Sequence, residues 1–224
     1  MNTVYDFEPL RYDVRPIDFP MARDFVTQHH YSKGMTNNTS GAFGLFEKAW
    51  LVGVLSFSTP CSENVRASVF GEDFRDRVTE LSRLVILDVT PNNAESFFIA
   101  RCLNLLKTSK PYLWSVVSFA DPSAGHVGTI YQASNAVYYG QSTASTAYID
   151  AEGRLRHRRQ CGHNISLAEA SNLGWTPMRR LGKHRYNFLL PDNRSHRRDL
   201  LDRLMLESLP YPKSSVSKNG YEAH

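Results

Sequence analysis

Acidic, basic and phenolic side chains lie beside short apolar stretches of this sequence, where an enzyme site could form. Asp121 is the first charged residue after the run LWSVVSFA, and Pro122 follows it directly. An acid at the carboxyl end of a central strand lies where open α/β sheets bind ligands, and it can accept a proton or ligate a cation. The alternative for Asp121 is a helix cap, a common role of aspartate. Its position alone leaves both roles open.

Arg83 and the neighbours His30 and Tyr31 are further candidates. Arg83 interrupts the run ELSRLVILD, and a buried arginine needs a partner, which we expect to be Glu80, Asp121 or a bound anion. A purely structural ion pair is the alternative. His30 and Tyr31 follow the first predicted helix, where they either hold a metal or a substrate or simply pack.

The cysteines and histidines form neither a disulfide framework nor a zinc site. Cys161 and His163 have too few companions at too loose a spacing for zinc. Cys61, Cys102 and Cys161 are unevenly spaced, which favours a reducing compartment. The first residues lack the pattern of a signal peptide, and no stretch approaches the roughly 20 apolar residues of a membrane helix. We therefore expect a cytoplasmic protein without a membrane partner.

Positive charge is concentrated in the last third of the chain. Residues 151–224 carry 14 Lys and Arg against 7 Asp and Glu, whereas residues 1–150 carry 12 against 15. Most of these cations are arginines, whose planar guanidinium suits phosphate, and aromatic residues lie among them. This pattern predicts a polyanion such as nucleic acid as the partner, with a solvated basic face as the alternative. The residues predicted to bind nucleic acid are Arg158, Arg159, Arg179, Arg180, Lys183 and Arg185.

Hydrophobic periodicity predicts a mixed α/β domain over residues 1–208, with a basic part at 151–208 and a mobile tail at 209–224. The first helix is expected to begin after a cap at Asp18, with Met21, Phe25 and Val26 on its buried side. The predicted strands span residues 42–46, 51–58, 80–88, 113–121, 144–150, 153–159 and 185–190.

Three further helices are predicted. One begins at a capping box of Asn92 and Glu95 and continues to about Lys107. The second spans residues 123–133 and is interrupted by two glycines, and the third spans residues 195–209. Helices and strands in this order make a mixed sheet flanked by helices.

Four segments resemble the Mom DNA-modification family of phage Mu and its relatives. They are HHYSKG at 29–34, ELSRLVI at 80–86, SFADPSAGHVGTIYQASNAVYYG at 118–140 and GWTPMRRLGKHRY at 174–186. The order of the predicted elements also resembles the GNAT acyltransferase fold, a central mixed twisted sheet flanked by helices. In that fold a tyrosine of the last helix serves as general acid, and its counterpart here is Tyr131.

The resemblance implies a transferase that converts adenine in phage DNA to its N6-carbamoylmethyl form and so protects the DNA from restriction. By this resemblance the catalytic residues are His30, Tyr31, Arg83, Asp121 and Tyr131. We assign donor binding to Ser82, Ser123, His126 and Gly128. Asp121 would bind or deprotonate the amine and Tyr131 would donate to the leaving group, on a base that has left the duplex stack. Arg83 with His30 and Tyr31 would stabilise developing negative charge or hold the donor.

The sequence leaves the donor open. Ordinary GNAT enzymes hold the coenzyme A pyrophosphate on a glycine-rich loop at a helix N-terminus. The corresponding VTPNNAES at 89–96 has no glycine, its Pro91 lacks an N–H, and its Glu95 repels phosphate. The CH2–CO–NH2 group of the product has the heavy atoms of a glycyl unit plus the amine, so a glycyl-tRNA is one candidate donor. The other candidate donor is acetyl-coenzyme A, in a redox reaction with iron for which His30 and Asp121 would be the ligands.

Two other classes compete with this interpretation. A small-molecule or protein N-acetyltransferase of the GNAT type, using acetyl-coenzyme A, would not need the basic last third of the chain. A DNA-binding domain without activity would leave the cluster of acid, base and phenol unexplained.

Overall fold

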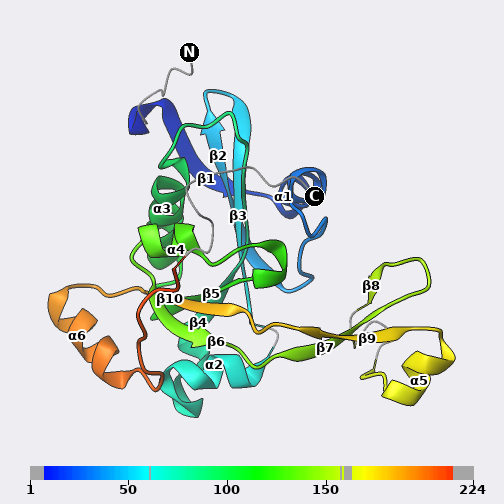
Figure 1. Cartoon of the computed structure of the whole chain (residues 1–224). Coiled ribbons are helices and arrows are strands. Elements are labelled where there is room, and N and C mark those ends of the chain that lie inside the picture. Colours follow the sequence, from blue (N-terminus) through cyan, green and yellow to red (C-terminus); the bar gives the residue numbers. More distant parts are fainter. Residues whose placement is uncertain (1–7, 61, 157, 159–162, 214–224) are drawn as a thin grey trace.

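The structure is a computed structural model that describes residues 8–60, 62–156, 158 and 163–213. Its centre is one seven-stranded sheet (Figure 1). The strands of this sheet are β1 (Tyr12–Ile17), β2 (Thr39–Glu47), β3 (Trp50–Ser58), β4 (Val78–Ile86), β5 (Ser115–Ala120), β6 (Val137–Gln141) and β10 (His184–Leu189). They are ordered β1-β2-β3-β4-β5-β10-β6, and every neighbouring pair is antiparallel except β4 and β5.

Helices cover both faces of this sheet. They are α1 (Phe19–His29), α2 (Glu63–Phe70), α3 (Ala94–Ser109), α4 (Thr129–Ala133) and α6 (Arg194–Arg203). Successive strand residues point to opposite faces, and in β3 Val54 packs with α1 whereas Leu55 packs with α3. In β5 Val116 joins the core under α3, whereas Val117 joins the core under α2 and α6. The mixed α/β class is therefore confirmed, as is the order of elements expected of a GNAT-like fold.

A smaller unit projects from one end of the sheet and is called the arm here (Figure 1). It consists of β7 (Ser145–Ile149), β8 (Leu155–Arg156), β9 (Thr176–Arg180) and α5 (Leu167–Asn172), with the strand order β8-β7-β9. The arm is connected to the sheet twice, because β7 follows β6 and β9 precedes β10 along the chain. A small core of its own, made by Tyr148, Ile165 and Ala170, holds the arm together.

The sheet opens between its two parallel strands. The pairing of β4 with β5 covers only Val78–Leu81 against Ser115–Ser118, while β4 runs on to Ile86 along β3. The pairing of β4 with β3 shifts at Ser82, where Phe57 pairs with Leu81 but Ser56 pairs with Arg83. Such a bulge reverses the alternation of side chains beyond it. Glu80 and Arg83 therefore share a face of the sheet, although they are three residues apart.

The predicted first helix is confirmed at its start and corrected on its buried side. The Asp18 side chain accepts a hydrogen bond from the Met21 N–H at 2.9 Å, which is the predicted cap. Met21 itself is exposed, because it lies in the first turn and the helix faces the sheet with Ala22 and Val26. The small side chain of Ala22 lets the helix lie close to the strands.

The predicted capping box at Asn92 is wrong. The cap of α3 is Asn93, which has a left-handed backbone at φ 75° and makes no side-chain capping bond. The Ala94 N–H instead bonds to the Pro91 carbonyl, so the loop closes on itself before the helix begins. A capping box does form elsewhere, between Ser166 and Glu169 at the start of α5.

Two other predicted helices are shorter than expected. The segment 123–133 divides into a 3-10 turn, Pro122–Ala124, and α4, because Gly125 and Gly128 adopt positive φ values. The last helix, α6, ends at Arg203 rather than at residue 209.

The expected tail does not begin at Leu209. The Leu209 N–H bonds to the Tyr138 carbonyl, and the Tyr211 hydroxyl donates to the Ala136 carbonyl. Residues 214–224 lie outside the described residues. No helix in the described ranges is long and apolar enough to cross a membrane.

Candidate active site

A pocket of about 720 Å³ lies where β4 and β5 separate. Its walls are the free end of β4, the last residues of β5, residues 29–31 after α1, residues 125–131 and Lys183. Beyond Leu81 the described chain gives β4 no partner strand on this side, so its backbone groups face the pocket. Separated parallel strands thus provide both a cavity and hydrogen-bonding groups for a ligand.

Glu80 and Tyr131 both line this pocket. Burial raises the pKa of Glu80 to about 6, although Lys183 and Arg83 lower it in part. Burial also raises the pKa of the Tyr131 phenol, which hydrogen-bonds to the Ser118 side chain on β5. At neutral pH Glu80 is therefore mostly ionised, whereas the Tyr131 phenol keeps its proton. From the sequence, Glu80 was expected only as a partner of Arg83.

Asp121 is both a cap and the centre of a charge cluster. Its Oδ1 accepts from the Ser123 N–H at 2.9 Å, while its Oδ2 lies 2.5 Å from Arg180 and 3.8 Å from Lys183. Burial opposes its ionisation, but the bonds from Ser123 and the two cations outweigh burial and hold the pKa of Asp121 below its usual value. A carboxylate with a lowered pKa is a weak base, so this geometry favours binding over deprotonation.

Arg83 was expected to pair with Glu80, Asp121 or a bound anion, but its hydrogen-bond partners are two backbone carbonyls. Its Nε donates to the Gly34 carbonyl at 2.7 Å, and one terminal nitrogen donates to the Ser82 carbonyl at 2.6 Å. Across the ranges that the structure describes, no ion pair joins Arg83 to Glu80 or Asp121. Arg83 therefore fixes the loop that carries His30 and Tyr31 against β4, and its positive charge at the pocket suits a bound anion.

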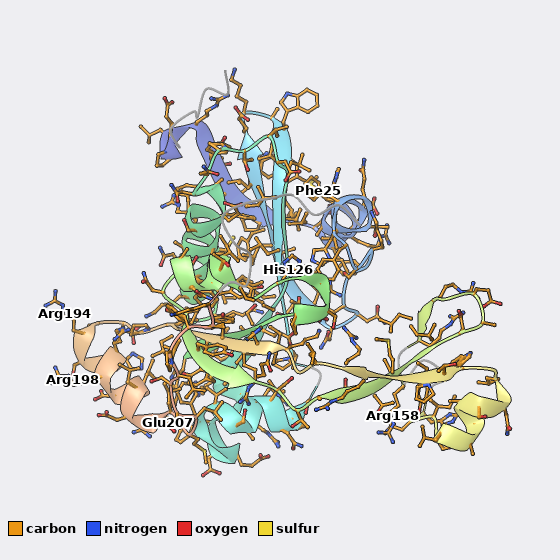
Figure 2. All side chains as sticks on the ribbon, in the orientation of Figure 1. Phe25, His126, Arg158, Arg194, Arg198 and Glu207 are labelled. Carbon is orange, nitrogen blue, oxygen red and sulfur yellow. The ribbon has the colours of Figure 1, made fainter. Side chains whose placement is uncertain are left out.

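The Tyr31 ring contacts the rings of His30 and His126, and all three residues line the pocket (Figure 2 labels His126). The Tyr31 ring lies 4.3 Å from the His30 ring and 5.6 Å from the His126 ring, and 60% of Tyr31 is exposed. Burial and the nearby Arg83 lower the pKa of His30 to about 4. Since the Ser32 N–H donates to its Nδ1, neutral His30 carries its proton on Nε2. It is a neutral hydrogen-bond donor at physiological pH.

The residues predicted to bind the donor are only partly brought together. His126 and Gly128 line the pocket, and Gly128 lies so close to the Tyr186 ring that a side chain has no room there. Ser82 also lines the pocket, but its hydroxyl is 3.1 Å from the Ser56 hydroxyl of β3. Ser123 is exposed and lies outside the pocket lining, and its role is to bind Asp121 through its N–H.

The residues predicted to bind nucleic acid occupy three places instead of one face. Arg158 and Arg179 are exposed on the arm, and Arg159 lies outside the described residues. Lys183 lines the pocket, and both Arg180 and Lys183 contact Asp121. Arg185 donates to the Tyr139 carbonyl at 2.8 Å, inside the fold. The end of β9 therefore brings Arg180 to the carboxylate that follows β5.

The iron site proposed from His30 and Asp121 does not fit the geometry. Asp121 faces two cations, which would repel a metal ion, and His30 uses Nδ1 to bind Ser32. Within the described part of the chain, no group of three or more His, Cys, Asp or Glu residues could hold a metal. Among the cysteines, Cys102 is free and buried in the core, and Cys61 and Cys161 lie outside the described residues.

Solved structures with a similar arrangement of elements are N-acetyltransferases. The spermidine N-acetyltransferase of Vibrio cholerae, crystallised with CoA and spermine, is 10% identical, with a TM-score of 0.46 over 81% of this chain and 96% of that one. An acetyltransferase of the GNAT family from Streptococcus pneumoniae is also 10% identical, with a TM-score of 0.45 over 80% and 99% of the two chains. At these TM-scores neither protein indicates what this pocket binds.

The sequence comparisons are more specific. The methylcarbamoylase mom of Escherichia phage Mu is 32% identical over 139 residues, which are 62% of this chain and 58% of the phage protein. The chain therefore matches less than two thirds of that relative. The Mom protein family matches residues 11–213, which include the pocket and the arm. This chain belongs to the Mom protein family.

Proposed function

We propose that this protein is a DNA-modifying transferase that converts adenine to its N6-carbamoylmethyl form, which would protect phage DNA from restriction. The observation that carries the proposal is the placement of a proton acceptor, Glu80, and a proton donor, Tyr131, in one pocket bordered by Arg180 and Lys183. Membership of the Mom family and the name of the phage Mu relative support the same reaction.

The acceptor in this proposal is the 6-amino group of an adenine that has left the duplex stack. This amine is a weak nucleophile, because its lone pair is delocalised into the ring, so its proton must be removed as the new bond forms. Glu80, with a pKa near 6, takes that proton, and the Tyr131 hydroxyl protonates the leaving group. Arg83 supplies positive charge and the free edge of β4 supplies backbone groups for the oxyanion.

A glycyl ester such as glycyl-tRNA is the donor that we favour. In the first step the adenine N6 attacks the ester carbonyl, the C–O bond breaks, and an N6-glycyl adenine forms. In the second step the glycyl nitrogen attacks ring carbon C6 and the original C6–N bond breaks. The original nitrogen then leaves as the amide of a CH2–CO–NH2 group, so the second step is an isomerisation that needs neither oxidant nor reductant.

The start of α3 argues against coenzyme A held as in ordinary GNAT enzymes. A phosphate at a helix N-terminus needs free N–H groups and no nearby negative charge. Here Pro91 has no N–H, the Ala94 N–H is bound to the Pro91 carbonyl, and Glu95 lies in the first turn. We expect isothermal calorimetry with coenzyme A and with acetyl-coenzyme A to detect no binding at micromolar concentration. Stoichiometric micromolar binding of either compound would contradict this prediction and favour the acetyl-coenzyme A donor.

The arm is proposed to bind double-stranded DNA through phosphate contacts. Figure 2 shows Arg158 on the arm and Arg194 and Arg198 on α6, at the opposite side of the molecule. We expect Arg158→Ala combined with Arg179→Ala to weaken DNA binding. The slope of the logarithm of the binding constant against the logarithm of the salt concentration should also become smaller, by roughly one for each lost phosphate contact. Arg194→Ala combined with Arg198→Ala removes the same charge and should leave both quantities unchanged.

Binding measured over a range of salt concentrations tests this assignment of the DNA contact. If the arm variant keeps the wild-type slope, the contact lies elsewhere. If the α6 variant loses as much affinity as the arm variant, net charge rather than the arm determines binding.

The reaction itself is tested in cells that express the chain. Their DNA is digested to nucleosides and analysed by mass spectrometry, and we expect an adenosine heavier by the carbamoylmethyl group. An acetylated polyamine or protein with unmodified DNA would instead favour the N-acetyltransferase alternative. DNA that stays unmodified while the chain binds it would favour a DNA-binding domain without activity.

A further inference from the structure

The segment that joins the arm to the sheet is pinned at the edge of the pocket. It consists of residues 181–183, between β9 and β10. The Ser142 N–H donates to the Lys183 carbonyl at 2.8 Å, and the Lys183 N–H donates to the Ser142 hydroxyl at 3.0 Å. Gly182 lies so close to the Ser142 carbonyl that a side chain would have no room. These contacts hold the segment in one conformation.

This rigid segment presents a large apolar side chain to solvent. Leu181 is 57% exposed, and its neighbours Arg180 and Lys183 both contact Asp121 at the pocket. Lys183 of the same segment lines the pocket, so an exposed leucine between these two cations is placed to meet a charged partner beside the pocket. The cations suit contacts with a phosphate backbone, and the leucine suits apolar contact with the stacked bases.

We propose that Leu181 enters the base stack of duplex DNA in place of the adenine that moves into the pocket. This inference rests on the proposed function, because a modified adenine must leave its duplex. Extrusion costs unstacking and unpairing, and it leaves a gap that an apolar side chain can fill. Leu181 fills that gap, while Arg180 and Lys183 hold the flanking phosphates.

Other exposed apolar residues are less suited to this role. Tyr31 lines the pocket and therefore meets the extruded base itself. Leu155 and Met178 lie on arm strands β8 and β9, farther along the chain from the cations that contact Asp121. Leu173, at the end of α5 on the arm, is 53% exposed and serves as a matched control.

The test compares Leu181→Ala, Leu181→Met and the control Leu173→Ala on DNA with the adenine replaced by 2-aminopurine, which fluoresces when unstacked. The sequence around the probe is one whose adenine the wild-type protein modifies in cells. One duplex places the probe opposite thymine, and a second places it opposite an abasic site, where no base pair must be broken. Thermal melting of each variant shows that it is folded.

On the paired duplex we expect Leu181→Ala to reduce the fluorescence increase and the modification in cells by roughly tenfold, since extrusion then lacks its substitute in the stack. On the duplex with the abasic site the loss should be clearly smaller, because no base pair has to be broken and only the cost of unstacking remains. Leu181→Met, which keeps the apolar volume, should retain the signal, as should Leu173→Ala.

Wild-type behaviour of Leu181→Ala on the paired duplex would overturn the proposal. Equal loss on both duplexes would also overturn it, because a general contact or a structural defect is not rescued by a missing partner base. If the wild-type protein yields no modified adenine, the proposed function fails first and the role of Leu181 fails with it.

Discussion

Replacing Glu80 with Gln or Tyr131 with Phe is expected to lower the modified adenine in cellular DNA by about 100-fold or more, the loss that follows removal of a catalytic acid or base. Each change keeps the size of the side chain and removes one proton acceptor or donor from the pocket. Mass spectrometry of digested DNA measures the loss. The matched controls are Glu47→Gln and Tyr211→Phe, whose polar groups lie outside the pocket lining and whose activity should stay at the wild-type level.

The stability of the Glu80 variant separates catalysis from a structural role. Burial raises the pKa of Glu80 to about 6, so the folded state disfavours its charged form. That penalty is present above pH 6 and fades as pH falls toward the ordinary pKa of glutamate. Glu80→Gln should therefore melt at or above the wild-type temperature at neutral pH while losing activity. A less stable, active Glu80→Gln would contradict this assignment.

The same pKa predicts the pH dependence of the reaction. Glu80 must be ionised to accept a proton, so the rate should fall as pH decreases through about 6. His30 does not account for this fall in rate near pH 6, since its pKa is lowered to about 4. The residual rate of Glu80→Gln, measured over the same pH range, should show no fall near pH 6. If the fall in rate near pH 6 persists unchanged in this variant, another titrating group causes it.

Replacing Asp121 with Asn is expected to abolish most modification without weakening DNA binding. Asparagine still accepts the Ser123 N–H, so the cap is kept, and only the charge that holds Arg180 and Lys183 at the pocket is lost. We expect at least a roughly 100-fold loss of modified adenine, the scale for losing a charged group that organises a site. DNA affinity should stay equal or rise, because Arg180 and Lys183 no longer share their charge with a carboxylate and can bind phosphate more strongly.

Binding over a range of salt concentrations, thermal melting and nucleoside analysis of the same Asp121→Asn variant test this prediction. The control Asp192→Asn removes a carboxylate that pairs with Lys107 and should change neither activity nor DNA affinity. A folded Asp121→Asn with wild-type activity would leave Asp121 as a cap only. A loss of affinity would show that Asp121 supports the DNA contact rather than opposing it.

Much of the fold could be predicted because its elements are encoded locally. The cap of α1 is a bond between Asp18 and a backbone N–H three residues later, and the hairpin of β2 and β3 follows from two apolar runs and a short turn. The strand β5 and the acid at its end were visible as one apolar run that stops at Asp121. By contrast, β1 was missed because it is an edge strand with alternating charges and Pro16, without an apolar pattern.

In the candidate site, the sequence determined one part and only the tertiary structure decided the other. The types and order of the motif residues indicated a Mom-like enzyme, since these side chains lie in short contiguous segments. Glu80 joined the site because a bulge at Ser82 turns it to the same face as Arg83, and that bulge depends on the partner strand β3. Arg180 reached Asp121 from 59 residues away because β9 leads back into the sheet beside the pocket. Local periodicity specifies which residues make a strand, whereas strand pairing, which joins distant segments, decides which side chains meet.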